Sequence, residues 1–340
     1  MRLCTRIIGC LGALVWFSCS QNRLDVDVSE IRIPETSITR LDSVAWAWSQ
    51  YPEALDRDFV HYLKWSPVQH YAFSALIPPD SAAQPAAARR TLKLFVGNPD
   101  IRASLQRIHQ LYSSKRVSEL KIQLEDLLKH YRYYFPQDSL PQLVSVCSGW
   151  NYTYAPFKSH LLISLDMYLG DTCSLYSFLP FPKYQIAKMS PDYLPSDLAR
   201  ALLLIKTDRQ PPGDFLLAHA VFYGKLFYGI KALLPKTEDR IILGYTPHHM
   251  EYLDKYEHAL WTYFAQDNKW FAQDLKIIRA HTTEGPFTAA ISKECPPRIA
   301  MWIGYRMVTA FMNRNSSVSL DSLFKIQDPH RIMRESAYKP

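Results

Sequence analysis

The residue best suited to covalent chemistry lies near the N-terminus. Cys19 follows the small residue Ser18 and an apolar stretch at residues 7–17, which Arg2 and Arg6 precede. A basic segment, an apolar segment and a small residue directly before a cysteine are what lipoprotein processing requires. The apolar stretch is shorter than the roughly 20 residues that span a bilayer, which disfavours a transmembrane helix. We therefore expect cleavage before Cys19 and acylation of its thiol, with an ordinary cleaved signal peptide as the alternative.

The eleven histidines form no recognisable zinc signature. No two of them stand four residues apart, so HExxH and its inverse HxxEH are absent and no single helix offers two imidazoles to a metal. His219 interrupts an apolar stretch, where a hydrogen-bonded core histidine is the ordinary explanation. The sequence thus predicts no metal ligands and no cofactor. The alternative is a site that folding assembles from His219, His248 or His281.

Other catalytic patterns are also missing from the sequence. It contains no GxSxG elbow, no GxGxxG loop and no P-loop. Asp166 and Asp171 flank a predicted turn, and an acid pair there would suit a glycosidase, but turn chemistry accounts for both residues. We therefore expect no catalytic residues and no enzymatic activity.

The patterning of apolar residues predicts a mostly helical α+β domain with a small central β-sheet. Two short runs rich in β-branched and aromatic residues, at 143–154 and 160–170, predict paired strands. Helical spacing of apolar residues predicts the surrounding helices. The predicted helices are 52–67, one from about 86, 115–135, 197–207, 214–234, 247–266, 268–281, 297–313 and one or two short ones in the C-terminal tail.

The composition is that of a globular protein, preceded by the predicted export signal. Residues 1–18 are the predicted signal peptide, 19–35 a lipidated tether that ends in a short strand, and 36–340 a single globular domain. Hydrophobic residues make up 48% of the chain, which is enough for a substantial core. The net charge of +7 is scattered, with no block of like charges, so nucleic-acid binding is not expected.

Three cysteines lie in the globular part of the chain. Cys147, Cys173 and Cys295 form no CxxC pair, which excludes a zinc knuckle and a thioredoxin-like motif. Cys147 and Cys173 lie on or beside the two strand-like runs and are the preferred disulfide pair in an oxidising compartment. Three unrelated buried thiols are the alternative.

Two arginines interrupt the otherwise apolar helix predicted at 297–313. Arg298 and Arg306 stand eight residues apart, on neighbouring helix faces. A buried guanidinium needs a carboxylate or several carbonyl partners, because an unpaired buried charge is very costly. We expect at least one of them to be a structural arginine, with two exposed arginines as the alternative.

Several longer segments carry a family resemblance. They are LLISLDMYLG at 161–170, KMSPDYLPSDLARAL at 188–202, FYGKLFYGIKALLP at 222–235, ILGYTPHHMEYL at 242–253 and PFTAAISKECPPRIAMWIGYRMVTAFMNRN at 286–315. In this order and spacing the chain resembles the gliding-motility lipoprotein GldB family of Bacteroidota. That family is in turn similar to predicted zinc-dependent proteases, which carry HExxH on one helix and a glutamate–glycine pair on the next.

The resemblance implies a protease-like scaffold that has lost its metal. The first helix reads DLARALLLIK where the histidines and glutamate would stand, and Tyr223 precedes Gly224 where a glutamate would be expected. The implied function is a non-catalytic envelope lipoprotein that supports gliding-motility or surface-adhesin machinery. The alternatives are an envelope hydrolase with a non-standard site, and a module that binds peptide or glycan in the former protease cleft.

Location and partners follow from the same resemblance and from the N-terminus. The expected partners are the lipid bilayer, through acylated Cys19, and unidentified envelope proteins of the motility or secretion machinery. Residues 20–23 lack the acidic run associated with surface export in this phylum, which favours a body that faces the periplasm.

Overall fold

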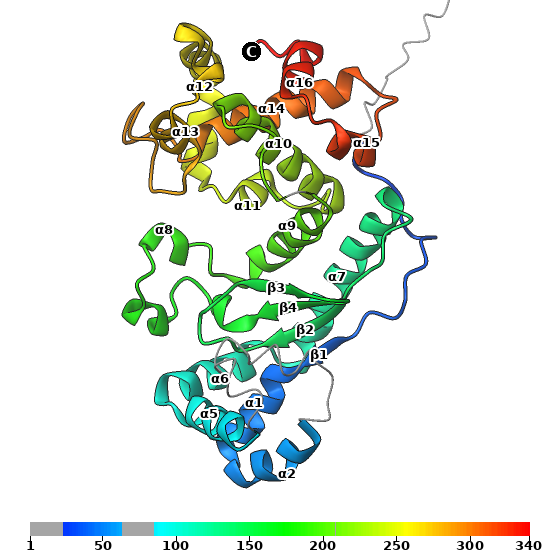
Figure 1. Ribbon diagram of the computed structural model, residues 1–340, viewed down its shortest axis with the longest axis vertical. Helices are drawn as coiled ribbons and strands as arrows, with labels where there is room; N and C mark the ends of the chain where they lie inside the picture. Colours follow the sequence, from blue (N-terminus) through cyan, green and yellow to red (C-terminus); the bar gives the residue numbers. More distant parts are fainter. Residues whose placement is uncertain (1–22, 63–84, 208) are drawn as a thin grey trace, which may run out of the picture.

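A computed structural model describes residues 23–62, 85–207 and 209–340 (Figure 1). The predicted signal peptide, Cys19 and the predicted end of a helix near Pro67 lie outside these residues. The described part is an α+β fold, 61% helical, with a small mixed sheet of four strands. The general fold class predicted from the sequence is therefore confirmed. In the described residues no helix has both the length and the apolar character needed to cross a bilayer.

The sheet has the strand order β1-β2-β4-β3. Its strands are β1 (Ile38–Arg40), β2 (Gln142–Val146), β3 (Tyr154–Phe157) and β4 (His160–Ser164). β2 pairs in parallel with β1 and β4, and β3 pairs antiparallel with β4. The central strands β2 and β4 are almost continuously apolar and buried, as expected for strands covered on both faces. The two runs predicted as strands do pair, and their pairing is parallel, whereas a separate strand, β3, begins at the last residue of the first run.

Helices surround the sheet and extend well beyond it. They are α1 (Leu41–Gln50), α2 (Pro52–Tyr62), α5 (Pro85–Gly97), α6 (Pro99–Leu111), α7 (Ser114–Tyr134), α8 (Lys183–Ile186), α9 (Leu194–Lys206), α10 (Leu216–Leu233), α11 (Asp239–Leu243), α12 (Pro247–Ala265), α13 (Leu275–Thr282), α14 (Ile299–Arg314), α15 (Leu320–Lys325) and α16 (Pro329–Ser336). Helices α1, α2, α5 and α6 gather at one end of the long axis, and α12–α16 at the other (Figure 1).

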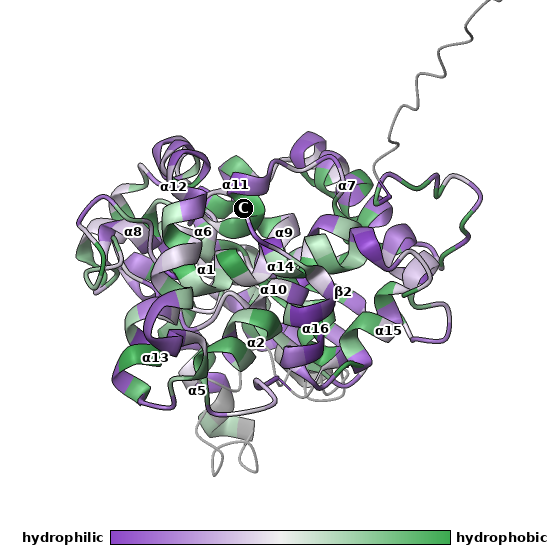
Figure 2. Ribbon diagram, turned by 90° about the horizontal axis from the view of Figure 1, so that it is seen from above, coloured by the Kyte–Doolittle hydropathy of each residue, from purple (hydrophilic) through white to green (hydrophobic). Residues whose placement is uncertain are grey.

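The part of the molecule that contains α12–α16 is built around the buried helix α10 (Figure 1). Its side chains are apolar almost all round, and α14 crosses it at very short range. A Cβ on Gly304 would come within 1.9 Å of the backbone oxygen of Ala220, and one on Gly224 within 2.4 Å of the Gly304 backbone. The crossing therefore requires glycine at both positions. In the view from above, the outer helices α12 and α16 are largely hydrophilic (Figure 2).

Two predictions for the C-terminal helices differ from the structure. The helix predicted at 268–281 begins only at Leu275, because Asp267 and Asn268 adopt left-handed backbone conformations within a 3-10 segment, Gln266–Phe271. Arg298 is not inside a helix: with φ of 57° it caps the N-terminus of α14, so the helical projection used for Arg298 and Arg306 does not apply.

The predicted tether is also shorter than its assigned range. Leu24 and Val28 are buried in the body, with 8% and 6% of their surface exposed. The Arg23 guanidinium donates hydrogen bonds to backbone oxygens at the end of α14 and in the loop that follows it. From Arg23 onward the segment is therefore packed on the globular part.

Candidate functional site

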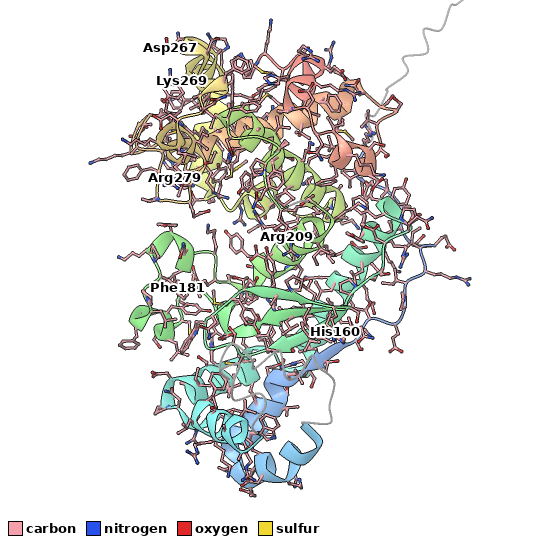
Figure 3. All side chains as sticks on the ribbon, in the orientation of Figure 1. His160, Phe181, Arg209, Asp267, Lys269 and Arg279 are labelled. Atoms are coloured by element: carbon pink, nitrogen blue, oxygen red, sulfur yellow. The ribbon has the colours of Figure 1, made fainter. Side chains whose placement is uncertain are left out.

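The candidate site is a cavity of about 360 Å³. Residues near the strands β3 and β4 line one side of it, and residues of α9, α11 and the start of α14 line the other. Five of its lining residues are charged, and we call it the charged cleft: Lys188, Asp197, Arg200, Glu284 and Arg298. They come from the segment after β4, from α9 and from the chain on either side of residues 285–297. Phe181, on the loop before α8, is one of its apolar walls (Figure 3).

One carboxylate, Glu284, serves two cations of the charged cleft. The Lys188 ammonium donates to Glu284 Oε1, and Arg298 Nε lies 3.0 Å from Glu284 Oε2. Arg298 also donates from Nη2 to the backbone oxygen of Leu243 at 2.6 Å, and its side chain is only 8% exposed. Burial, together with the positive charge of Arg298, lowers the pKa of the Lys188 ammonium. Arg298 is thus held by an acid and a carbonyl, the arrangement that the sequence led us to expect for at least one of the two arginines.

Helix α9 supplies the opposite wall. Pro195 lies in the first turn of α9, and most of the apolar side chains of the helix are buried in the core. Ser196, Asp197 and Arg200 line the cleft. The Asp197 carboxylate accepts a hydrogen bond from the Tyr168 hydroxyl at 2.9 Å. Burial raises the pKa of Asp197, against the opposing effect of the positive Arg200.

Within the described residues, two polar groups on α9 have no hydrogen-bond or close ion-pair partner. Ser196 is 1% exposed, and its hydroxyl forms no hydrogen bond within the described residues. The Arg200 guanidinium lies over the ring of Phe227, 5.5 Å from its centre, and no carboxylate of the described residues approaches it within 4 Å. A hydroxyl and a cation one helical turn apart, both lining a cavity, can together bind an oxyanion.

The charged cleft does not suit a zinc ion. Three of its charged groups are cations, and both of its carboxylates already have hydrogen-bond partners. Zinc sites use neutral imidazoles, thiolates or free carboxylates, usually three from the protein in a catalytic site. Across residues 23–62, 85–207 and 209–340 no group of three such side chains is close enough to hold a metal.

The histidines named from the sequence are not brought together as a site. His281 is 3% exposed, its Nδ1 lies 2.7 Å from the Ile277 oxygen and its Nε2 lies 2.9 Å from the Tyr263 hydroxyl. The side chain of His248 is 75% exposed at the start of α12. His219 is half-buried on α10, and burial lowers its pKa.

Residues 21–340 match the family described as gliding motility protein GldB. The chain belongs to the GldB family. The match covers the whole described structure, including the charged cleft, and it indicates a gliding-motility-related lipoprotein of the cell envelope. Neither the curated proteins nor the solved structures contain a significant match.

Asp166 and Asp171 do not form an acid pair in this GldB-family fold. Asp166 is fully buried and accepts backbone hydrogen bonds from Ser148 at 3.1 Å and Trp150 at 2.7 Å. Burial raises the pKa of Asp166, and these two hydrogen bonds act in the opposite direction. Asp166 therefore holds the turn after β2, whereas Asp171 is exposed on the surface.

The disulfide predicted between Cys147 and Cys173 is not formed. Both thiols are free, as is Cys295. Cys147 is completely buried at the end of β2, and burial raises the pKa of its thiol. Cys173 is only half-buried beyond the turn after β4. Proximity to paired strands did not bring the two sulfurs together, because the intervening turn carries Cys173 away from the strand.

Arg306 is exposed, as the sequence analysis allowed for one of the two arginines. Its Nε lies 2.7 Å from Glu257 Oε1, and its side chain is 44% exposed. The hydroxyl of Tyr338 donates to the same carboxylate at 2.5 Å. Arg306 thus attaches the C-terminal residues to α12 and α14 and does not reach the charged cleft.

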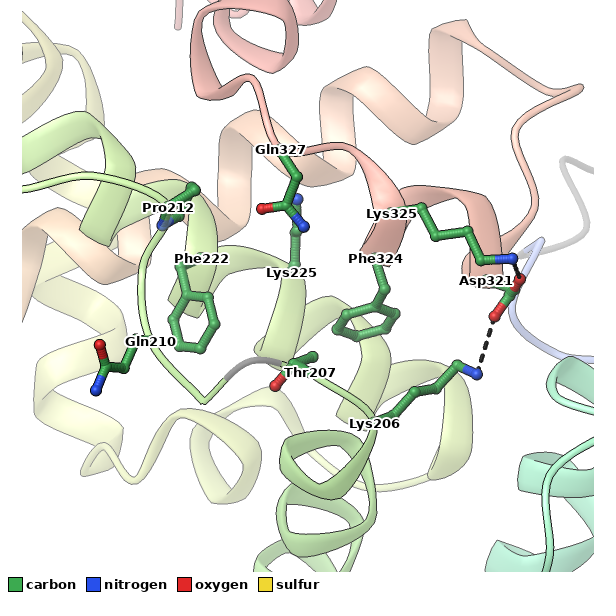
Figure 4. Close-up of a pocket in the computed structure, with 10 residues that line it drawn as sticks. All are labelled: Lys206, Thr207, Gln210, Pro212, Phe222, Lys225, Asp321, Phe324, Lys325 and Gln327. Atoms are coloured by element: carbon green, nitrogen blue, oxygen red, sulfur yellow. Dashed lines mark ion pairs between the residues drawn. The ribbon is translucent and has the colours of Figure 1, made fainter.

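A second, smaller pocket of about 180 Å³ contains the buried lysine of α10 (Figure 4). Lys225 is 7% exposed and donates to the backbone oxygen of Ile326. Phe222 and Phe324 stand on either side of it in Figure 4. Burial lowers the pKa of Lys225 from 10.5 to about 8.

Sequence reasoning singled out Arg298 as a structural arginine, but it did not predict either pocket. Lys188, Glu284 and Arg298 have no motif spacing, and 96 residues separate the first two. A weak signal existed in α9, where Asp197 and Arg200 interrupt an apolar helix at a spacing that places them on one face.

Proposed function

We propose that the chain is a non-catalytic envelope lipoprotein, anchored through acylated Cys19, that supports gliding-motility or surface-adhesin machinery. The observation that carries the proposal is the GldB-family match over residues 21–340. The proposed scaffold is that of a zinc protease without its metal ligands, and its body faces the periplasm. The chemistry of the charged cleft is consistent with this proposal, because three cations and two hydrogen-bonded carboxylates are not a set of zinc ligands.

Deletion of the gene in its native bacterium tests the cellular role. A deletion strain should lose colony spreading or the display of surface adhesins, and wild-type protein should restore it. Cys19→Ala protein should fail to restore it, because the unanchored body leaves the membrane. A deletion strain with normal spreading and normal adhesin display overturns the proposal.

Elemental analysis of the purified full-length protein tests the non-catalytic part. Zinc should be far below one ion per chain, and a casein substrate should show no metal-dependent cleavage. Stoichiometric zinc that is lost on changing His219 or His248 would instead establish a hydrolase with a non-standard site.

A second candidate function, a peptide-binding module, is favoured by the unpartnered groups on α9. The Ser196 hydroxyl and the Arg200 guanidinium both line the charged cleft. Guanidinium binds carboxylate with two parallel hydrogen bonds, and a cavity of about 360 Å³ is at the lower end of the size range of ligand pockets. The apolar wall of Met167, Phe181 and Met189 can receive a side chain. A peptide's C-terminal residue, with its free carboxylate, fits these features.

Methyl NMR on methionine-labelled full-length protein tests this second function. A pool of random tripeptides with free C-termini should shift the methyl signals of Met167 and Met189, and the same pool with C-terminal amides should not. Arg200→Gln should abolish the shifts and Arg200→Lys should retain part of them. Arg306→Gln is the matched control outside the cleft. Equal shifts with both pools, or no shift with either, would exclude carboxylate binding.

A further inference from the structure

The first described residue is fixed to the body by four backbone oxygens. Arg23 donates from Nη1 to the oxygens of Met312 and Asn315, and from Nη2 to those of Ser316 and Val318. These carbonyls belong to the end of α14 and the loop that follows it. Helix C-termini carry unsatisfied carbonyls and a partial negative charge, which a guanidinium satisfies.

The chain between the lipid and this anchor point is very short. Arg23 is four residues after Cys19, and a fully extended chain spans at most about 3.6 Å per residue, or roughly 14 Å over this distance. Leu24 and Val28, both buried, prevent the next residues from lengthening the free segment. An acylated Cys19 would therefore hold the end of α14 close to the bilayer surface.

We propose that the surface at residues 313–317 faces the membrane and lies against its headgroups. The inference rests on the proposed acylation of Cys19. Four of these residues are exposed and polar, and one of them is a cation: Asn313, Arg314, Ser316 and Ser317. Such a surface suits contact with polar and anionic headgroups, and none of the large exposed apolar side chains that would insert into the bilayer belongs to it.

This orientation directs the opposite end of the molecule away from the membrane. Helices α2 and α5 lie at the far end of the long axis from α14–α16 (Figure 1). Exposed residues of α5, such as Leu94 with 69% of its surface accessible, should therefore not meet lipid.

Fluorescence quenching in proteoliposomes tests the orientation with the lipidated full-length protein. In a Cys173→Ser background, a bimane fluorophore is attached to Ser317→Cys or, as the distal control, to Leu94→Cys. The vesicles contain phosphatidylcholine with a nitroxide on its headgroup. Quenching is expected for the Ser317→Cys probe and not for the Leu94→Cys probe.

A lengthened tether provides the matched control. Twenty Gly/Ser residues inserted after Asn22 leave the lipid attached but add a flexible segment of roughly 25 Å root-mean-square length. Quenching of the Ser317→Cys probe should then be lost. Equal quenching at both positions, or quenching that survives the insertion, overturns the orientation alone. Protein that fails to float with the vesicles and takes up no palmitate overturns the lipoprotein proposal as well.

Discussion

Replacing Lys225 by methionine should stabilise the protein at neutral pH. The ammonium of Lys225 is buried in α10, and no carboxylate in the described part of the chain lies within 4 Å of it. This ammonium donates a hydrogen bond to the backbone oxygen of Ile326. Methionine has nearly the same length and no charge, so Lys225→Met removes the desolvation cost without opening a cavity.

The magnitude follows from the lowered pKa of Lys225. A change from 10.5 to about 8 corresponds to roughly 3 kcal/mol of unfavourable free energy for the charged form, at about 1.4 kcal/mol per pH unit. Loss of the hydrogen bond to Ile326 costs about 1 kcal/mol, and up to about 3 kcal/mol if that oxygen stays unsatisfied. A net gain of up to about 2 kcal/mol in the free energy of unfolding is therefore expected at pH 7, the largest value applying if the Ile326 oxygen finds another donor.

The gain should depend on pH in a defined direction. Below about pH 8 Lys225 is charged in both the folded and unfolded states, so wild-type protein bears the full cost. Between about 8 and 10.5 the unfolded state binds more protons than the folded state, and wild-type stability rises with pH. The advantage of Lys225→Met should therefore shrink from pH 7 to pH 10. Urea unfolding followed by tryptophan fluorescence at both pH values measures it.

Lys231→Met on the same helix is the matched control. Lys231 has an acidic partner, Asp239, at 2.9 Å, and it donates to the Thr237 oxygen at 2.7 Å. Its replacement should lower the free energy of unfolding by about 1 kcal/mol. If Lys225→Met lowers stability by more than about 1 kcal/mol at pH 7, or if its effect is the same at pH 10, burial of an unpaired charge is the wrong account.

Three further predictions concern anchoring, the charged cleft and the helix crossing. Cys19→Ala should abolish palmitate labelling and membrane association, and labelling that survives would refute acylation at this residue. Arg298→Ala should lower the free energy of unfolding by about 2 kcal/mol, because its half-buried carboxylate partner loses a cation, whereas Arg306→Ala should cost less than about 1 kcal/mol. Equal losses in thermal melts would contradict that difference. Gly304→Ala should cost roughly 3 kcal/mol or more, since its Cβ would meet a backbone oxygen of α10, and Gly97→Ala should be nearly neutral, with nothing within 4 Å of its Cβ. A soluble, fully stable Gly304→Ala protein would disprove the close crossing.

Local sequence patterns determined much of the secondary structure. Apolar spacing predicted helices at 115–135 and 214–234, and the structure has them at Ser114–Tyr134 and Leu216–Leu233. These helices could be predicted because the spacing of apolar residues along a short stretch of chain already shows the helical period. Helix α6 was missed although its start carries a strong local signal, since Asn98 caps it and Pro99 stands at its first position. The β-rich runs predicted strands but not their parallel pairing.

Tertiary structure alone decided which residues act together. The partners of Glu284 and Arg298 lie 96 and 55 residues away, and the Arg23 contacts span 289 residues or more. From the sequence we could infer that a buried arginine needs an acidic partner, but not which residue that partner is. Local periodicity shows which face of an element is apolar, whereas the meeting of two faces depends on the packing of the whole core. The approach of Gly304 to Ala220 shows this most clearly, because a missing Cβ has no consequence until another helix lies against it.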